Sequence, residues 1–257
     1  MNRMHGYREL LEKEVIEAWR TYRLGIVCGL SVLLGIVAPL LVRYLPDIVG
    51  LGRGAGELGP DESSLPDVLD LFLRNLLLFG GLAGVLLAMG AIAGERERGT
   101  LSLVLAKPIG RAAFLWAKLV GIALVLGAGV ALAVLAAWLY SAMLFQPTSA
   151  QPWVAMAFVA WLSTMVAASI AFAGSAVATS SLGAGAIGLA ALAILTVGST
   201  IAPLDVWLPT GLFDVALAAG LQEVSPDLDP ARTIAISLGV ILTAFGIAWW
   251  RFRNAEA

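Results

Sequence analysis

Four long stretches of this chain carry no Asp, Glu, Lys or Arg, and they constrain its fold more than any other feature. The stretches cover residues 24–42, 75–94, 119–204 and 233–250. A run of about 18 apolar residues is long enough to cross the hydrocarbon core of a bilayer as a helix. Only 13% of the 257 residues are charged, whereas soluble domains carry about a quarter. The sequence therefore predicts an all-α polytopic membrane protein.

The longest uncharged stretch, 119–204, is several times the length of one bilayer crossing and must fold back on itself. Two polar breaks divide it, one from Gln146 to Pro152 and one from Thr179 to Gly183. We therefore expect a single transmembrane domain over residues 1–257. Its six predicted spans lie at about 24–42, 74–94, 119–145, 153–178, 183–202 and 232–250.

Lysine and arginine are unevenly divided among the segments between the predicted spans. Twelve of the sixteen lie before span one, between spans two and three, or after span six, and six spans place these three segments on one side. Basic residues concentrate in cytoplasmic loops. We therefore expect a multi-pass protein of the cell (inner) membrane, with both termini cytoplasmic and the acidic loops outside.

Residues 5–23, before the first span, have the periodicity of an amphipathic helix. Such a helix lies in the membrane interface with its apolar face among the lipid headgroups. Packing against a cytoplasmic subunit is an alternative of similar weight. The apolar side chains that recur at steps of three and four residues are Tyr7, Leu11, Val15, Trp19 and Tyr22.

The segment between spans two and three, residues 95–111, places a short apolar stretch between charged corners. Four alternating charges end span two, Gly99 breaks its helix, and Thr100 can cap a new one. Pro108 ends that helix after about two turns, and so short a helix needs a surface to bury against. Headgroups or a groove on a partner protein would supply it. The residues of this candidate docking segment are Glu95, Arg96, Glu97, Gly99, Thr100, Leu101, Leu103, Val104, Leu105, Pro108 and Arg111.

Residues 203–223, before the last span, are too apolar for a free loop, yet their prolines and acids prevent a full crossing. A pair of short interfacial or re-entrant helices on the outer side is expected there.

Small and hydroxylic side chains supply most of the remaining polarity within the spans. The glycine pairs Gly80 and Gly84, and Gly90 and Gly94, predict close helix packing. The sequence Gly174-Ser175-Ala176 is interpreted in the same way. Several hydroxyls either line a pathway or, as we favour, hydrogen-bond their own helices. They are Ser163, Thr164, Ser169, Thr196, Ser199 and Thr200.

Several kinds of catalytic site are absent from the sequence. None of the three lysines follows a glycine, so the chain lacks the Gly-Lys-Ser/Thr of a P-loop. One histidine, His5, and one cysteine, Cys28, cannot build an intramembrane hydrolase or a metal cluster. No cofactor and no nucleic-acid partner are expected. The uncharged spans also argue against a secondary carrier, which usually holds titratable groups inside the bilayer.

The order of residues after span two is Glu95-Arg96-Glu97, then Gly99-Thr100-Leu101, an apolar stretch from Leu103 to Leu105, Pro108, Arg111 and Lys118. With this order the chain resembles permease subunits of the type-2 ABC exporter family. The N-terminal helix, the six spans and the re-entrant pair extend the resemblance over nearly the whole chain. In length and loop style the chain is nearest to the permease of the transporter that serves nitrous-oxide reductase maturation.

The resemblance implies that residues 95–111 form a coupling helix that docks in a groove of a separately encoded ATPase. Two permease copies, as a homodimer, would assemble with two ATPase subunits, which hold the ATP and Mg²⁺. The permease would form the translocation path, would not be catalytic, and would serve export. An accessory protein on the outer side is left open as a further partner. A secondary carrier or a non-transporting membrane scaffold is the alternative function.

Overall fold

The regular secondary structure is helical throughout the part of the chain that the structure describes. The computed structural model describes residues 12–14, 16–50, 64–100, 110–145, 149–198, 208–222 and 228–254, with the side chains of 45–50 excepted. Six helices in these ranges are long and apolar enough to cross a membrane. The predicted class, an all-α polytopic membrane protein, is confirmed.

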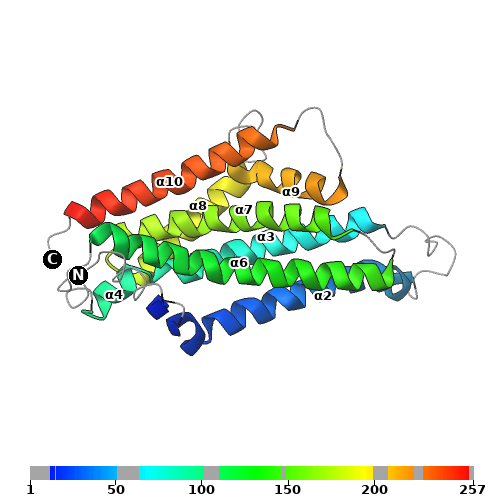
Figure 1. Ribbon diagram of the computed structural model, residues 1–257, viewed down its shortest axis with the longest axis horizontal. Coiled ribbons are helices and arrows are strands. Elements are labelled where there is room, and N and C mark those ends of the chain that lie inside the picture. The colour runs from blue at the N-terminus through cyan, green and yellow to red at the C-terminus, as the bar shows by residue number, and fades with distance from the viewer. Residues whose placement is uncertain are drawn as a thin grey trace.

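The long helices run beside one another along the longest axis of the molecule (Figure 1). They are α2 (Arg23–Gly50), α3 (Leu65–Met89), α6 (Arg111–Leu144), α7 (Ala150–Val177), α8 (Ser181–Gly198) and α10 (Pro230–Asn254). Three shorter elements are α4 (Ala93–Glu97), the 3-10 turn η2 (Pro209–Gly211) and α9 (Leu212–Leu221).

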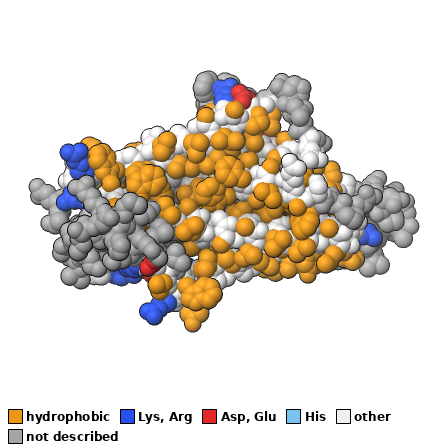
Figure 2. All heavy atoms as spheres, viewed as in Figure 1, with side chains coloured by type: hydrophobic (Ala, Val, Ile, Leu, Met, Phe, Trp, Pro, Cys, Tyr) orange, Lys and Arg blue, Asp and Glu red, His pale blue; other side chains and the backbone are white. Residues whose placement is uncertain are grey.

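Successive long helices run in opposite directions, so their termini gather at two ends of the bundle. The first residue of α2 and the last of α10 lie at the same end, on the left of Figure 1, together with α4. We call this the basic end, because Arg23, Arg98, Arg111, Arg251 and Arg253 belong to it. The opposite end, where α3 begins with Asp67 and Asp70, is called the acidic end. Between the two ends, hydrophobic side chains cover much of the face that Figure 2 shows.

The first turns of α3 and α6 extend beyond the predicted spans. The helix α3 begins at Leu65 instead of residue 74, because its charges are accommodated locally. Asp67 accepts a hydrogen bond from the Ser64 backbone N–H at 3.0 Å, and Asp70 pairs with Arg74 at 2.7 Å. The helix α6 likewise begins at Arg111 instead of residue 119.

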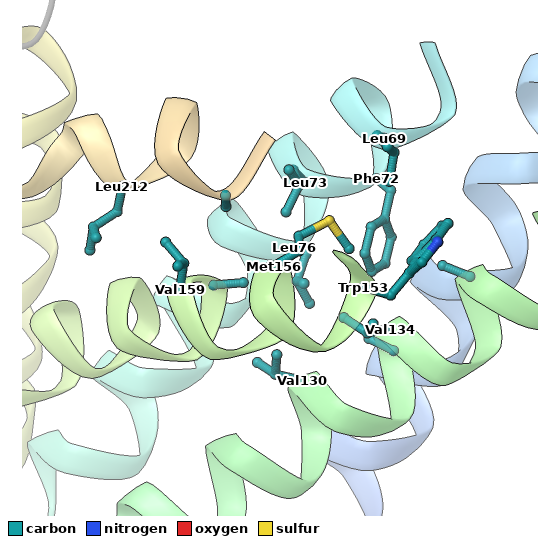
Figure 3. Close-up of a cluster of buried hydrophobic side chains, with 14 of the residues drawn as sticks. Leu69, Phe72, Leu73, Leu76, Val130, Val134, Trp153, Met156, Val159 and Leu212 are labelled. Atoms are coloured by element: carbon teal, nitrogen blue, oxygen red, sulfur yellow. The ribbon is translucent and has the colours of Figure 1, made fainter. Parts of the chain in front are cut away.

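Buried apolar side chains form two clusters. The cluster nearer the acidic end joins α3, α6, α7 and α9, and includes Phe72, Trp153, Met156 and Leu212 (Figure 3). The other cluster joins α3, α6, α7 and α10 nearer the basic end. The ten residues of α9 extend about 15 Å, too short for a crossing. Its buried residues pack beside α3 and α7, and the predicted pair of re-entrant helices stays a prediction, because 203–207 and 223 lie outside the described residues.

Glycines allow α3 and α8 to approach α7 closely. A Cβ atom on Gly80 would lie 2.6 Å from Thr164 Cγ2, and one on Gly84 would lie 3.0 Å from the Thr164 carbonyl oxygen. A Cβ on Gly188 would lie 2.8 Å from Ala171 Cβ. The close packing predicted from glycine spacing is therefore confirmed at these positions, and it occurs within one chain.

Candidate functional site: a charged junction at the basic end

The second membrane-crossing segment bends between α3 and α4, and a side chain from α7 satisfies the backbone at the bend. The Ser175 hydroxyl is fully buried. Its oxygen accepts hydrogen bonds from the backbone N–H groups of Ile92 at 3.0 Å and Ala93 at 2.9 Å. The same hydroxyl donates to the Met89 carbonyl oxygen at 2.8 Å. Because buried backbone groups need partners, Ser175 holds the bend in place.

The short helix α4 ends at Gly99 in a motif that requires a left-handed residue. Gly99 has φ +67° and donates to the Arg96 carbonyl at 3.1 Å, while the Thr100 N–H donates to the Glu95 carbonyl at 3.0 Å. This pair of bonds is the Schellman ending of a helix, which favours glycine. The Thr100 hydroxyl also donates to the Glu95 carbonyl, at 3.2 Å. Thr100 thus closes α4, and the helix it is expected to begin falls in 101–109, outside the described residues.

Two side chains of α4 hold the turn between α7 and α8. The Arg96 guanidinium donates to the Ala178 carbonyl at 2.7 Å, just after the last turn of α7. The Glu97 carboxylate accepts hydrogen bonds from the Ser181 N–H at 3.0 Å and the Ser181 hydroxyl at 2.6 Å, at the first residue of α8. A cation at a helix C-terminus and an anion at a helix N-terminus both complement the helix dipole. The α4 charges therefore attach this turn to the end of span two.

Glu95 lies in a buried ion-pair network and not on the surface. Its side chain is 4% exposed, and its Oε1 lies 2.6 Å from the Nζ of Lys118 in α6, which is 6% exposed. Lys118 Nζ also lies 2.9 Å from Glu14 Oε1 in the helical segment before α2, and Lys13 Nζ lies 3.8 Å from Glu95. Buried charges require partners of this kind. Glu95 was grouped with the docking residues, but its carboxylate contacts this chain's own helices.

Arg111 follows the stretch 101–109 and attaches the start of α6 to the last helix, α10. Its guanidinium donates to the Arg253 carbonyl at 2.7 Å and to the Phe252 carbonyl at 3.4 Å, in the last turn of α10. One turn along α6, the Phe114 ring stacks on Phe252 with centroids 5.6 Å apart. The stretch 101–109, with Leu101, Leu103, Val104, Leu105 and Pro108, lies outside the described residues, but both of its flanks are anchored.

We call the set Glu95, Arg96, Glu97, Arg111, Lys118, Ser175 and Ser181 the charged junction. Residues 93–97, before the stretch 101–109, contact α6, α7 and α8. Residues 111 and 118, after it, contact α10 and the segment before α2. No group of three or more potential metal ligands occurs in the described ranges.

The segment before α2 presents its aromatic side chains outward. Residues 12–14 and 16–20 are helical, Trp19 is 73% exposed and Tyr22 is 77% exposed. Tyr22 has φ 57°, which separates this helical segment from α2. The other side of the segment contributes Glu14 to Lys118. This arrangement suits an interface helix, although Tyr7, Leu11 and Val15 lie outside the described residues.

Three of the six hydroxyls that could line a pathway bond to their own helices, as favoured: those of Thr164, Ser169 and Thr196. The hydroxyl of Thr164 donates to the Trp161 carbonyl at 2.8 Å, and that of Ser169 to the Val166 carbonyl at 2.8 Å. Thr196 likewise donates to the Leu192 carbonyl at 2.9 Å. Ser199 and Thr200 lie outside the described residues.

Sequence reasoning missed the roles of three junction residues. Ser175 was interpreted as small-residue packing, Ser181 as part of a polar break, and Lys118 as a topology marker. A signal for Lys118 exists in retrospect, because it lies more than one helical turn inside an apolar helix, where an unpaired charge is costly. Ser175 and Ser181 carry no such signal, since serine is common both in packed helices and in polar turns.

A comparison with known protein families places the chain among transport proteins. The profile of a family described as "ABC-2 family transporter protein" matches residues 10–257. A relative, described as "Uncharacterized transmembrane protein YxlG" of Bacillus subtilis (strain 168), is 27% identical over 112 residues. That match covers 42% of this chain and 43% of the relative, so it spans less than half of either protein.

Proposed function

The chain belongs to the ABC-2 family of transporter proteins, and from this premise we propose that its basic end docks a separate ATPase subunit. The family is the non-catalytic membrane component of ABC transporters, so this chain is a multi-pass transmembrane subunit of such a transporter. The ATPase would bind ATP and Mg²⁺, since no P-loop exists in this sequence. The docking element would be the apolar stretch 101–109 between the two anchored flanks.

The charged junction is the observation that supports this proposal. Apolar residues such as Leu103 and Leu105 lie between Thr100, which closes α4, and Arg111, which is bonded to α10. ATP-driven movement of a partner at 101–109 would be passed to α7 and α8 through Arg96 and Glu97. It would be passed to α10 through Arg111.

The distribution of basic residues supports a basic end that faces the cytoplasm. The cytoplasm is the compartment that holds ATP. With both termini at that end, the acidic end would face outward. Transport would then run toward the acidic side as export. The narrower likeness to the nitrous-oxide reductase maturation permease stays a prediction.

A homodimer with two ATPase subunits is the assembly we favour. The hydroxyls inside one bundle are bonded to their own helices, so a polar path would have to form between two copies. The helix α8 is suited to such a contact, because its Leu182, Ile194 and Val197 are 82%, 70% and 62% exposed. An accessory protein at the acidic end would be an additional partner.

The test is purification of the tagged chain from membranes of its own host. We expect a P-loop ATPase to co-purify and the complex to hydrolyse ATP in a vanadate-sensitive manner. Charge reversal at Glu97 should leave insertion intact while uncoupling hydrolysis from transport, and charge reversal at Asp67, at the acidic end, is the matched control. Purification without any P-loop protein would favour a secondary carrier or a scaffold instead.

A further inference from the structure

A groove opens between α2 and α3 on the side of the bundle. Its volume is about 340 Å³, within the range of ligand-binding pockets. Leu126 and Val130 of α6 also line it. Leu30 and Leu34 of α2 face it from one wall, and Phe79 and Ala83 of α3 from the other. The lining is almost entirely apolar, and both walls are membrane-crossing helices.

The groove is accessible from the surroundings of the bundle. Ile26 and Leu30 on α2 are 68% and 38% exposed, and Leu86 on α3 is 60% exposed. Each of these side chains lines the groove. Since the helices cross a membrane, the material next to this opening is the hydrocarbon of lipid chains. An acyl chain can enter the groove sideways without passing through water.

The basic-end mouth of the groove is polar. Arg23 lines the groove and also a second, smaller cavity of about 40 Å³, and Leu87 belongs to both. Arg98 lines the small cavity as well. In the described part of the chain, no carboxylate forms an ion pair with Arg23 or Arg98. An apolar groove thus ends at Arg23, beside a small cavity that Arg98, Glu14 and Glu17 also line.

The described acids nearest Arg23 have other partners, and Glu17, which lines the small cavity beside Arg23, pairs with Lys13 at 3.8 Å. Glu14 and Glu95 both pair with Lys118, at 2.9 and 2.6 Å. Glu97 accepts from the first residue of α8. Among the described residues, Arg23 therefore has no carboxylate within ion-pair distance, and an anion from outside can complement it. A guanidinium at the membrane interface binds a phosphate group through charge-assisted hydrogen bonds.

We propose that this groove binds one anionic phospholipid from the leaflet at the basic end, with an acyl chain between α2 and α3 and the headgroup phosphate at Arg23. A second copy of the chain is a poorer occupant, because its engaged acids offer nothing to Arg23. The lipid would fill the space between α2 and α3 near the bend after Met89, and so would attach α2 to the moving end of span two. The site does not depend on the identity of the ATPase.

The test uses the full purified chain and native mass spectrometry. The probes are phosphatidylglycerol and phosphatidylcholine with identical acyl chains. We expect the wild-type chain to retain phosphatidylglycerol about fivefold better, the size of effect of one basic residue near an anionic lipid surface. Arg23→Ala should reduce this preference to about one, and Arg23→Lys should keep part of it. Arg43→Ala, at the other end of α2, is the matched control and should keep the full preference.

A second variant tests the apolar part of the site. Ala83→Phe places a ring in the groove and should lower retention of both lipids, while inorganic phosphate alone should not compete with either. All variants are compared at equal helicity and equal elution volume. Should Arg23→Ala fail to fold, Arg23→Gln measures the headgroup preference in its place. Ala83→Phe still measures the contribution of the apolar groove.

Several results would overturn the proposal. Equal retention of the two lipids by the wild-type chain would show that Arg23 does not select an anion. Equal losses in Arg23→Ala and Arg43→Ala would show a general charge effect. If Ala83→Phe disrupts a dimer and leaves lipid retention unchanged, a second copy occupies the groove. Competition by inorganic phosphate would show a headgroup site that does not use the groove.

Discussion

Replacing Ser175 by alanine removes the hydroxyl that satisfies the backbone at the bend between α3 and α4. The N–H groups of Ile92 and Ala93 lose bonds of 3.0 and 2.9 Å, and the Met89 carbonyl loses one of 2.8 Å. A buried amide left without a partner costs about 1–3 kcal/mol. The two amides together therefore predict a loss of about 2–6 kcal/mol. The vacated volume is smaller than a water molecule, so solvent does not restore the bonds.

The assay is equilibrium unfolding of the purified chain in mixed micelles, followed by far-UV circular dichroism. Ser169→Ala is the matched control, because this serine lies in the same helix and is 1% exposed. Its hydroxyl donates only to the Val166 carbonyl of its own helix, and its removal should change stability by less than about 0.5 kcal/mol. A Ser175→Ala effect equal to that of the control would refute the role assigned to the bend.

Three further predictions concern the charged junction. Lys118→Met leaves the buried Glu95 without its nearest cation, at 2.6 Å, and with only Lys13 at 3.8 Å, and should cost about 3 kcal/mol in the same unfolding assay. Adding Glu95→Gln should recover part of that loss, and no recovery would argue against a shared network. Gly99→Ala, at φ +67°, should cost about 1 kcal/mol, whereas Gly110→Ala, at φ −61° with open space around it, should cost less; equal costs would contradict the Schellman assignment. Glu97→Ala should speed amide hydrogen exchange in the first turn of α8 but not in α10, and unchanged exchange at Ser181 would show that the carboxylate does not cap this helix.

The membrane-crossing architecture was predictable because its signals are local. A helix that crosses a bilayer must be apolar over its whole length, so four charge-free stretches, the longest divided by two polar breaks, predicted the six candidate spans found in the described ranges. The glycines that let α3 pack on α7 were also visible, because spacing by four places them on one helix face. The residues at which helices begin were harder to predict from the sequence. The helix α3 begins earlier than predicted, since the Asp70–Arg74 pair accommodates charges that the uncharged-stretch criterion excluded.

The junction was only partly predictable because its contacts join distant parts of the sequence. Ser175 lies 83 residues from Ile92 along the chain, and nothing near either residue reports the contact. The break after Met89 is set by a side chain of α7, whereas Gly99 ends α4 where its local signals predicted a break. Glu95 was expected in the docking segment as one of the charges that end span two. Its burial depends on Lys118 and Glu14, which the fold brings to it.

Photo-crosslinking from residue 103 tests most directly whether the junction connects this chain to an ATPase. A photoreactive phenylalanine analogue replaces Leu103 in one variant and Met143 in the other, an exposed residue toward the acidic end of α6. Membranes of the native host are irradiated, and the adducts are identified by mass spectrometry. We predict an adduct with a P-loop ATPase from position 103 and none from position 143. No ATPase adduct from 103, or the same adduct from both positions, would contradict the account.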